Sequence, residues 1–241
     1  MIGATSLPIL VYHRFSDEQC SDRFTVSQRI FELQLQYLHE NGYRSIRFSD
    51  LLTGISTRGI GRRVLLTIDD GYECASRFAI PLLKRYGFSA TCFIPVGLIG
   101  EQNEWDGGGR PLMNEATLRA LPSDQVEIAL HSWRHIDYRT LSATQIAADL
   151  WACRSQLDAL RIPYVPVLAY PFGRVPCDLR AQGCWRTAIR KAGISMACRV
   201  GNRLNNMPLR DPYMLTRTNV RGDEAHWKFR VKVALGRSKP F

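Results

Sequence analysis

Two short stretches of this sequence carry residue types that could do acid–base and metal chemistry. In the first, residues 63–71 (RVLLTIDDG), an apolar run fit for a buried strand ends on Asp69 and Asp70, followed by Gly71. Adjacent carboxylates repel each other, and a nearby cation would offset the repulsion that otherwise raises a carboxylate pKa. Taken alone, the segment is also explained by an Asp-Gly turn between a strand and a helix.

The second stretch is HSWRH, residues 131–135, which directly follows the strand-like run VEIAL. Two histidines four residues apart face the same side of a helical turn, so His131 and His135 could bind one cation. An ordinary pair of surface histidines is the alternative. Together the two stretches offer one carboxylate and two imidazoles for zinc, which would leave an open position for a water with a pKa near 7. The spare carboxylate could then act as general base.

Apolar segments fit for strands alternate with helical patterns along almost the whole chain. The strand patterns lie at residues 8–12, 43–46, 64–68, 89–94, 126–130, 167–170, 194–197 and 214–220. The helical patterns lie at residues 27–41, 74–86, from about 114, 142–160 and 181–192. This alternation is typical of a parallel sheet with helical connections.

The chain length favours closure of that sheet into a single-domain, distorted (β/α) barrel of about seven parallel strands. No glycine-rich phosphate motif follows a strand, which weakens the alternative of an open dinucleotide-binding sheet. No repeat or linker divides the sequence, so residues 1–241 are predicted to form one domain. Active sites of such barrels lie at the carboxyl ends of the strands, where both unusual stretches fall.

Bulk composition is that of a soluble globular protein, with 45% hydrophobic residues, 22% charged residues and a formal net charge of +10. The basic excess favours anionic partners, but it is spread along the chain and is also consistent with a solvated basic surface. Seven scattered cysteines without a Cys-x-x-Cys pair indicate reduced thiols in a cytoplasmic protein. The first residues resemble a strand more than a signal peptide, although export with a removed signal stays open.

Three motifs in order resemble those of the polysaccharide deacetylases, the NodB-homology family of metal-dependent carbohydrate esterases. They are TIDDG at residues 67–71, HSWRH at residues 131–135 and AYPFG at residues 169–173. The third motif normally begins with arginine, and Ala169 stands in that place. The resemblance extends over most of the chain and implies a NodB-type barrel.

Carried over by position, the resemblance implies roles for five residues. Asp69 would be the general base, and Asp70, His131 and His135 would be the ligands of a divalent metal, zinc above all. The backbone N–H of Phe172 would help to form the oxyanion hole for a tetrahedral intermediate.

The motif that normally supplies the proton donor, Leu-x-His, is changed here to Leu215-Thr216-Arg217. Arginine is a poor acid because its pKa lies above about 12, so Arg217 could instead orient Asp69 or bind an anionic group. His13, at the end of the first predicted strand, is a candidate donor, and a structural hydrogen-bonded histidine is the alternative. The family's arginine and tryptophan partners of the base have no clean match; Trp185 lies nearby but in the wrong context.

The resemblance implies hydrolysis of N-acetyl groups from N-acetylhexosamine units of a bacterial exopolysaccharide or cell-surface polysaccharide. Trp105 and Asp106, in a glycine-rich loop that could also be mobile cover, are candidate sugar contacts, as are Tyr170 and Pro171. A lipid-linked oligosaccharide is a further candidate substrate, with peripheral contact to a membrane.

Two alternatives come from other functional classes. One is a catalytically weak glycan-binding module that keeps the fold and the metal. The other is nucleic-acid binding or phosphoesterase activity, which the absence of aromatic–basic interleaving and of further clustered carboxylates disfavours.

Overall fold

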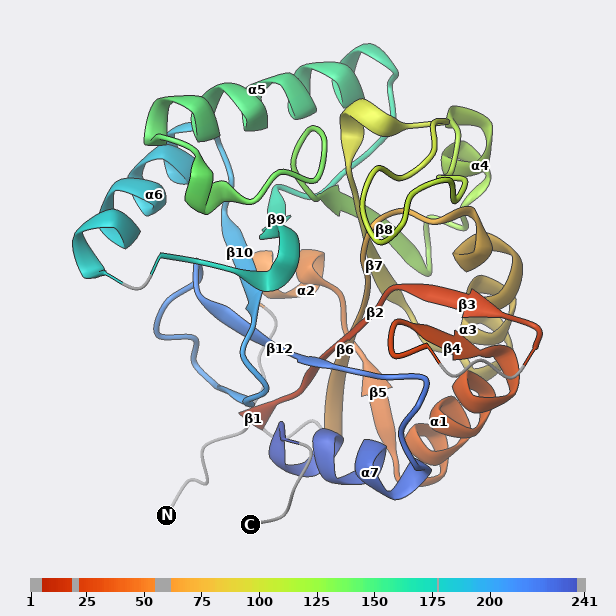
Figure 1. The fold of residues 1–241 in the computed structure, drawn as a ribbon. Coiled ribbons are helices and arrows are strands. Elements are labelled where there is room, and N and C mark those ends of the chain that lie inside the picture. The colour runs from red at the N-terminus through yellow and green to blue at the C-terminus, as the bar shows by residue number, and fades with distance from the viewer. Residues whose placement is uncertain (1–5, 19–21, 55–61, 177, 238–241) are drawn as a thin grey trace.

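Seven parallel strands form a closed ring at the centre of the computed structural model, which describes residues 6–18, 22–54, 62–176 and 178–237 (Figure 1). The strand order is β2-β12-β10-β9-β8-β7-β6, and β6 pairs back with β2 to close the ring. These strands are β2 (Ile9–Tyr12), β6 (Arg62–Ile68), β7 (Ala90–Ile94), β8 (Val126–Leu130), β9 (Val167–Ala169), β10 (Met196–Val200) and β12 (Leu215–Asn219). The predicted distorted barrel of about seven strands is confirmed.

The distortion of the barrel is visible along β6, which has two partners on the same side. Its first residues pair with β5 (Tyr43–Ser45), and its last four pair with β2. β5 therefore joins the sheet without entering the closed ring. The part of β6 that leads to the two aspartates lies inside the ring and is buried on both faces.

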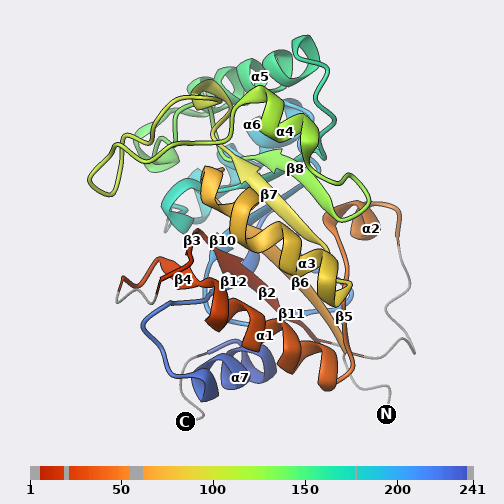
Figure 2. The same ribbon diagram turned by 90° about the vertical axis from the view of Figure 1, so that its right-hand side faces the viewer.

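Helices surround the barrel, as Figures 1 and 2 show. They are α1 (Gln28–Glu40), the π-helical turn η1 (Ala75–Ala79) with α3 (Ile80–Tyr86), α4 (Glu115–Ala120), α5 (Ala143–Ala159), α6 (Leu179–Lys191) and α7 (His226–Leu235). The helix α2 (Phe48–Leu52) lies instead at the amino-terminal end of the barrel, where its Phe48 packs against Phe93 of β7. The sequence patterns predicted neither α2 nor α7.

Local sequence signals account for several helix ends. The hydroxyl of Ser27 accepts a hydrogen bond from the Ile30 N–H at the start of α1, and Ser142 forms a reciprocal capping box with Gln145 at the start of α5. Gly87 ends α3 with a φ of 68°, a left-handed conformation that glycine adopts without steric cost. These caps fix where α1 and α5 begin and where the connection from α3 to β7 begins.

Alternation along the strands divides the buried residues between the barrel interior and the helix-facing side. Leu65 of β6 belongs to the cluster that fills the barrel with side chains such as Phe93, Ala129 and Leu215, while Leu66 and Ile68 pack toward the helices. By the same alternation Thr67 and Asp69 follow Leu65 on the inner side. The interior therefore becomes polar just where it reaches the carboxyl ends of the strands.

Small elements decorate that end of the barrel. Beyond the carboxyl ends of the strands lie the paired strands β3 (Arg14–Ser16) and β4 (Thr25–Ser27) and the long loop between β7 and α4 (Figure 2). The same end carries three 3₁₀ turns, η2 (Val96–Leu98), η3 (Tyr138–Thr140) and η4 (Pro171–Gly173). At the other end, β1 (Ser6–Leu7) pairs with β11 (Asn205–Asn206).

Among the described residues no helix combines the length and apolar character needed to cross a bilayer. The described cysteines are free thiols: Cys92, Cys153 and Cys198 are buried, Cys74 is half-buried and Cys184 is exposed. Cys20 and Cys177 lie outside the described residues.

Candidate active site

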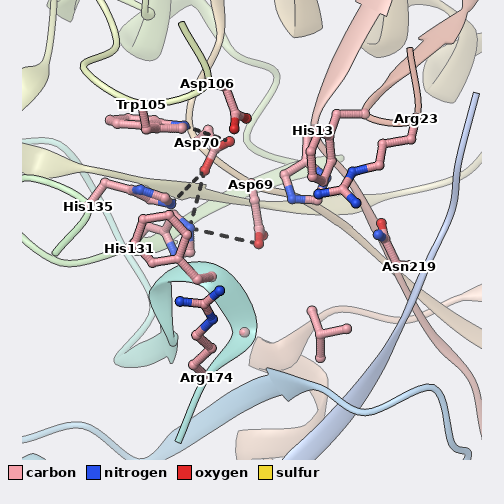
Figure 3. Close-up of a pocket in the computed structure, with 14 residues that line it drawn as sticks. His13, Arg23, Asp69, Asp70, Trp105, Asp106, His131, His135, Arg174 and Asn219 are labelled. Atoms are coloured by element: carbon pink, nitrogen blue, oxygen red, sulfur yellow. Dashed lines mark hydrogen bonds and ion pairs between the residues drawn. The ribbon is translucent and has the colours of Figure 1, made fainter. Parts of the chain in front are cut away.

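A cavity of about 430 Å³ opens at the carboxyl ends of the strands (Figure 3). Figure 3 shows Asp69 and Asp70 at its centre, the two histidines of the HSWRH stretch on one side, and His13, Arg23 and Asn219 on the other. The full lining is His13, Arg23, Phe24, Asp69, Asp70, Trp105, Asp106, His131, His135, Phe172, Gly173, Arg174, Val200 and Asn219. The structure thus brings both sequence motifs into one cavity.

Asp70, His131 and His135 form a compact ligand set. The Oδ1 atom of Asp70 lies 3.3 Å from Nε2 of His131 and 3.2 Å from Nε2 of His135, and one donor atom from each residue lies within 4.8 Å of the others. Ligands about 2.0–2.1 Å from a tetrahedral zinc ion stand about 3.3 Å apart, so the spacing fits.

The surroundings of these donor atoms also fit a cation. Nδ1 of His131 donates to the carbonyl of Ala169 at 2.8 Å, which directs the Nε2 lone pair of the neutral ring toward Asp70. The buried Oδ1 of Asp70 has no hydrogen-bond partner in the described part of the chain. Burial alone would raise the pKa of Asp70, yet the facing imidazoles of His131 and His135, when they carry a proton on Nε2, hold this pKa well below its usual range.

The backbone between the two histidines differs from the prediction. Residues 131–135 form a turn without helix, in which Ser132 has a φ of 66° and His135 a φ of 55°. The expected helical turn is therefore wrong, because the chain reverses directly after β8. The turn is held by hydrogen bonds from the backbone N–H of Trp133 to both carboxylate oxygens of Asp149 on α5, at 3.1 Å each. The imidazoles converge by this route instead of by helical spacing.

Asp69 stands beside the ligand set and has a partner of its own. The guanidinium of Arg217, fully buried on β12, donates from Nη1 to Oδ1 at 2.5 Å and from Nη2 to Oδ2 at 2.7 Å. Nη1 also donates to the hydroxyl of Thr67, and the guanidinium lies over the ring of Phe93. Burial raises the pKa of Asp69, but the charge and hydrogen bonds of Arg217, together with the nearby imidazoles of His131 and His13, outweigh it, so the pKa is lowered and the carboxylate is ionised at neutral pH.

His13 follows β2 and lines the cavity from the side opposite to the metal ligands (Figure 3). Its ring packs edge-on against Phe24, with centroids 5.2 Å apart. Its buried Nδ1 has no hydrogen-bond partner among the described residues. A structural histidine would normally have such a partner. The residue is half-buried, so the rest of its ring reaches the cavity.

Comparison with known proteins agrees with this geometry. A family model described as polysaccharide deacetylase matches residues 57–196, which is more than half of the chain. The chain belongs to this family. The matched segment contains both aspartates and both histidines of the site.

Individual relatives support the same assignment. The chain is 26% identical over 170 residues to the putative polysaccharide deacetylase YxkH of Bacillus subtilis, covering 70% of this chain and 57% of YxkH. It is 31% identical over 90 residues to a poly-β-1,6-N-acetyl-D-glucosamine N-deacetylase of Staphylococcus aureus, covering 37% of this chain and 31% of that protein. The chain therefore spans only part of the length of both relatives.

Among solved structures, IcaB from Ammonifex degensii superposes with a TM-score of 0.76 at 23% identity and covers 98% of each chain. At this level of identity the likeness shows the shared barrel fold.

The departures from the family motifs have a structural explanation in Arg217. The third motif lacks its arginine at Ala169, and Arg217 reaches Asp69 from β12, the last strand of the barrel. Ala169 contributes its backbone carbonyl to His131. Of the two uses predicted for Arg217, the structure shows the orientation of Asp69. Trp185 is buried against Tyr138 and Tyr170, away from the base.

The turn η4 brings a strained backbone to the cavity wall. Phe172 has a φ of 58°, and its ring meets the His135 ring edge-on at 4.5 Å. Gly173 follows with a φ of 64°, and a Cβ built there would lie 2.5 Å from Cγ2 of Val200 and 2.8 Å from its nitrogen. Only glycine fits this position, as expected for a loop that approaches its neighbours closely.

The four predicted sugar contacts divide into two pairs. Trp105 and Asp106 line the cavity, so their contact with sugar stays a prediction; Asp106 lies 3.7 Å from Nη1 of Arg14. Tyr170 and Pro171 do not line it. Tyr170 is buried with its hydroxyl donating to the carbonyl of Tyr213, and its assignment as a substrate contact is corrected because its polar group is already used within the core.

Sequence reasoning missed Arg23 and Arg174 of the cavity wall, which lie in loops without a motif. Each guanidinium rests over the ring of a phenylalanine of the lining, Arg23 over Phe24 at 4.3 Å and Arg174 over Phe172 at 5.5 Å. Sequence adjacency of Arg23 to Phe24 gives a weak signal; no signal marks Arg174.

Proposed function

We propose that this protein is a divalent-metal-dependent hydrolase that removes N-acetyl groups from N-acetylhexosamine units of a bacterial polysaccharide. One observation carries the proposal: Asp70, His131 and His135 form a buried ligand set, while Asp69 stands beside them with a separate partner. Family membership supports the class of reaction. Zinc is the metal that best suits two imidazoles and one carboxylate.

The chain's own residues divide the chemistry between them. Asp70, His131 and His135 would hold a divalent ion, which when bound would supply Lewis acidity toward water and a carbonyl oxygen. Asp69, kept ionised by Arg217, accepts the proton of the water that attacks the amide carbonyl. The backbone N–H of Phe172 donates to the oxygen on which negative charge develops.

His13 donates a proton to the departing amine in this scheme. An amine is a poor leaving group unless it is protonated, and Arg217 cannot serve because its charge is committed to Asp69. His13 lies across the cavity from Asp70, His131 and His135, with Asp69 between them, so an amide bound over Asp69 would have His13 on one side and the ligand set on the other. The place of His13 in the cavity lining supports this assignment.

The substrate class is supported by relatives rather than by the cavity alone. The Staphylococcus aureus relative is named for an N-acetyl-D-glucosamine polymer, so we propose an N-acetylglucosamine-containing exopolysaccharide or cell-surface glycan. Arg23 and Arg174 would meet a phosphate if the glycan is presented as a lipid-linked oligosaccharide.

The test uses an N-acetylated oligosaccharide of β-1,6-linked glucosamine and measures released acetate. Asp69→Asn is expected to lower turnover by about 100- to 10,000-fold while zinc still binds with one equivalent per chain, because Asp69 is not a ligand. Asp158→Asn, at an exposed position on α5, is the matched control and should retain turnover. Chelation should abolish activity and added zinc restore it. Unchanged turnover of Asp69→Asn would overturn the mechanism.

A glycan-binding module that retains the metal is the second candidate, favoured by the arginine at the position of the family's acid. It predicts binding of the same oligosaccharide without release of more than one acetate per chain. Steady multiple turnover excludes it.

A further inference from the structure

The two histidines of the proposed metal site differ in how their Nδ1 atoms are held. His131 follows the common pattern, since its Nδ1 donates to a backbone carbonyl that fixes the ring orientation. His135 does not: its buried Nδ1 has no hydrogen-bond partner in the described part of the chain. Another contact must therefore hold the His135 ring toward Asp70.

The ring of Phe172 meets the His135 ring edge-on at 4.5 Å, and the indole of Trp105 makes the closer, face-to-face contact. It stacks on the His135 ring with centroids 4.0 Å apart and an interplanar angle of 23°. Its Nε1–H also donates to Oδ2 of Asp70 at 3.3 Å (Figure 3), which leaves Oδ1 directed at the two imidazoles. One side chain thus touches two of the three ligands and engages the carboxylate oxygen that faces away from them.

The loop that carries Trp105 is tied to the strand end that carries Asp70. The N–H of Met113 donates to the carbonyl of Gly71 at 2.8 Å, and the N–H of Glu73 donates to the carbonyl of Pro111 at 3.0 Å. Both contacts fall within three residues of Asp70. The loop is thus a fixed part of the site, whereas mobile cover was one of the two predictions for it.

Within the loop, buried Asn103 sets the position of the indole. Its Nδ2 donates to the carbonyl of Trp105 and to the hydroxyl of Tyr72, and its Oδ1 accepts from the N–H of Arg110 at 2.8 Å. Trp105 itself packs with Tyr72, Leu98 and Leu112 in a small apolar cluster. The ring is therefore placed before any ligand arrives.

We propose that Trp105 is a positioning residue of the metal centre: it fixes the His135 ring by stacking and the Asp70 carboxylate by its indole N–H, and so sets metal affinity. Groups that orient metal ligands in this way change affinity by about 10- to 100-fold when removed. The face of the indole that stacks on His135 is closed to sugar, and contact with sugar by the other face stays a prediction. This inference rests on the metal site of the proposed function.

The experiment measures zinc and cobalt affinity of the metal-free protein by competition with a chromophoric chelator. Trp105→Phe keeps a stacking ring and loses the N–H, and is expected to weaken zinc binding about tenfold. Trp105→Leu loses both contacts and is expected to weaken it about 100-fold, with a changed visible spectrum of bound cobalt. Trp227→Phe, at an exposed position on α7, is the matched control and should bind both ions like the unmodified chain.

The outcomes separate this role from the others. A purely structural Trp105 would lower the denaturation midpoint of the metal-free protein and leave both metal affinities within twofold of the unmodified chain, which would overturn the inference. The conservative Trp105→Phe keeps the test valid if Trp105→Leu fails to fold. If the unmodified chain binds neither zinc nor cobalt, the proposed metal site is refuted, and the role of Trp105 with it. If the unmodified chain binds them and the variants bind them equally well, only the role of Trp105 is refuted.

Discussion

Replacing Arg217 by methionine tests whether the buried ion pair with Asp69 organises the site. Both guanidinium nitrogens that point at Asp69 donate to it within 2.7 Å, and the arginine is fully buried. Methionine fills much of the same volume but leaves the Asp69 carboxylate buried without its counter-charge. Removing one partner of such a pair costs about 3–5 kcal/mol of unfolding free energy. A domain of this kind has only about 5–15 kcal/mol in total, so the loss is large.

The pH dependence of this loss has a definite sign. In the unmodified chain the pKa of Asp69 is lowered, so the carboxylate contributes stability above the pKa of the unfolded chain, about 3.9, and loses it as the pH falls through the lower folded pKa. In Arg217→Met burial acts without the arginine and raises the pKa of Asp69. The gap in stability between the two proteins is therefore expected to be widest near neutral pH and to narrow as the pH falls.

Urea unfolding of the metal-free proteins, in the presence of chelator, measures both effects. The double variant Asp69→Asn with Arg217→Met removes both charges and should recover most of the stability that Arg217→Met loses, because buried pairs are often replaced at little net cost. Arg180→Met, at an exposed position on α6, is the control. The reasoning is refuted if Arg217→Met costs less than about 1 kcal/mol, or if the double variant is no more stable than the single one.

Two further predictions address the other walls of the cavity. His13→Gln is expected to lower the rate of amide deacetylation by about 100-fold or more and to leave zinc affinity unchanged. Hydrolysis of p-nitrophenyl acetate should slow far less, because its leaving group, p-nitrophenolate, departs without a proton. Equal losses of rate on both substrates would rule His13 out as the donor. Gly173→Ala is expected to cost about 1–3 kcal/mol, since its Cβ would meet Val200 at a positive φ, whereas Gly183→Ala on α6, where nothing lies within 4 Å, should be neutral or stabilising in the same urea titration.

The barrel and the four central side chains could be predicted because strand periodicity and strand-end chemistry are local signals. A buried strand that ends on Asp69 and Asp70 places two carboxylates at the carboxyl edge of a parallel sheet, whatever the rest of the chain does. The run VEIAL places His131 at the same edge, at the end of β8, which is separated from β6 only by β7. Residues at the same edge of one closed sheet converge without further information.

What could not be predicted depends on contacts between segments far apart in sequence. For Arg217, which lies 148 positions from Asp69, the sequence predicted orientation of Asp69 as one of two uses, because nothing local to residue 217 chooses between Asp69 and an anionic ligand. The left-handed residues of the HSWRH turn depend on Asp149 of α5 to receive the Trp133 N–H. α7 and the contact of Trp105 with His135 likewise follow from packing rather than from periodicity.

The two adjacent aspartates would repel each other if they stood alone, but each has different neighbours that stabilise its charge. Asp69 continues the inward alternation of β6 and meets Arg217, which neutralises it, whereas Asp70 turns out of the strand at a φ of 71° and meets two imidazoles and the Trp105 indole. With neutral histidines, the buried groups then carry one uncompensated negative charge, and the divalent ion of the proposed function would leave the site with one positive charge in excess. That excess would favour the oxyanion of a tetrahedral intermediate over the neutral amide, which is the difference in binding that catalysis requires.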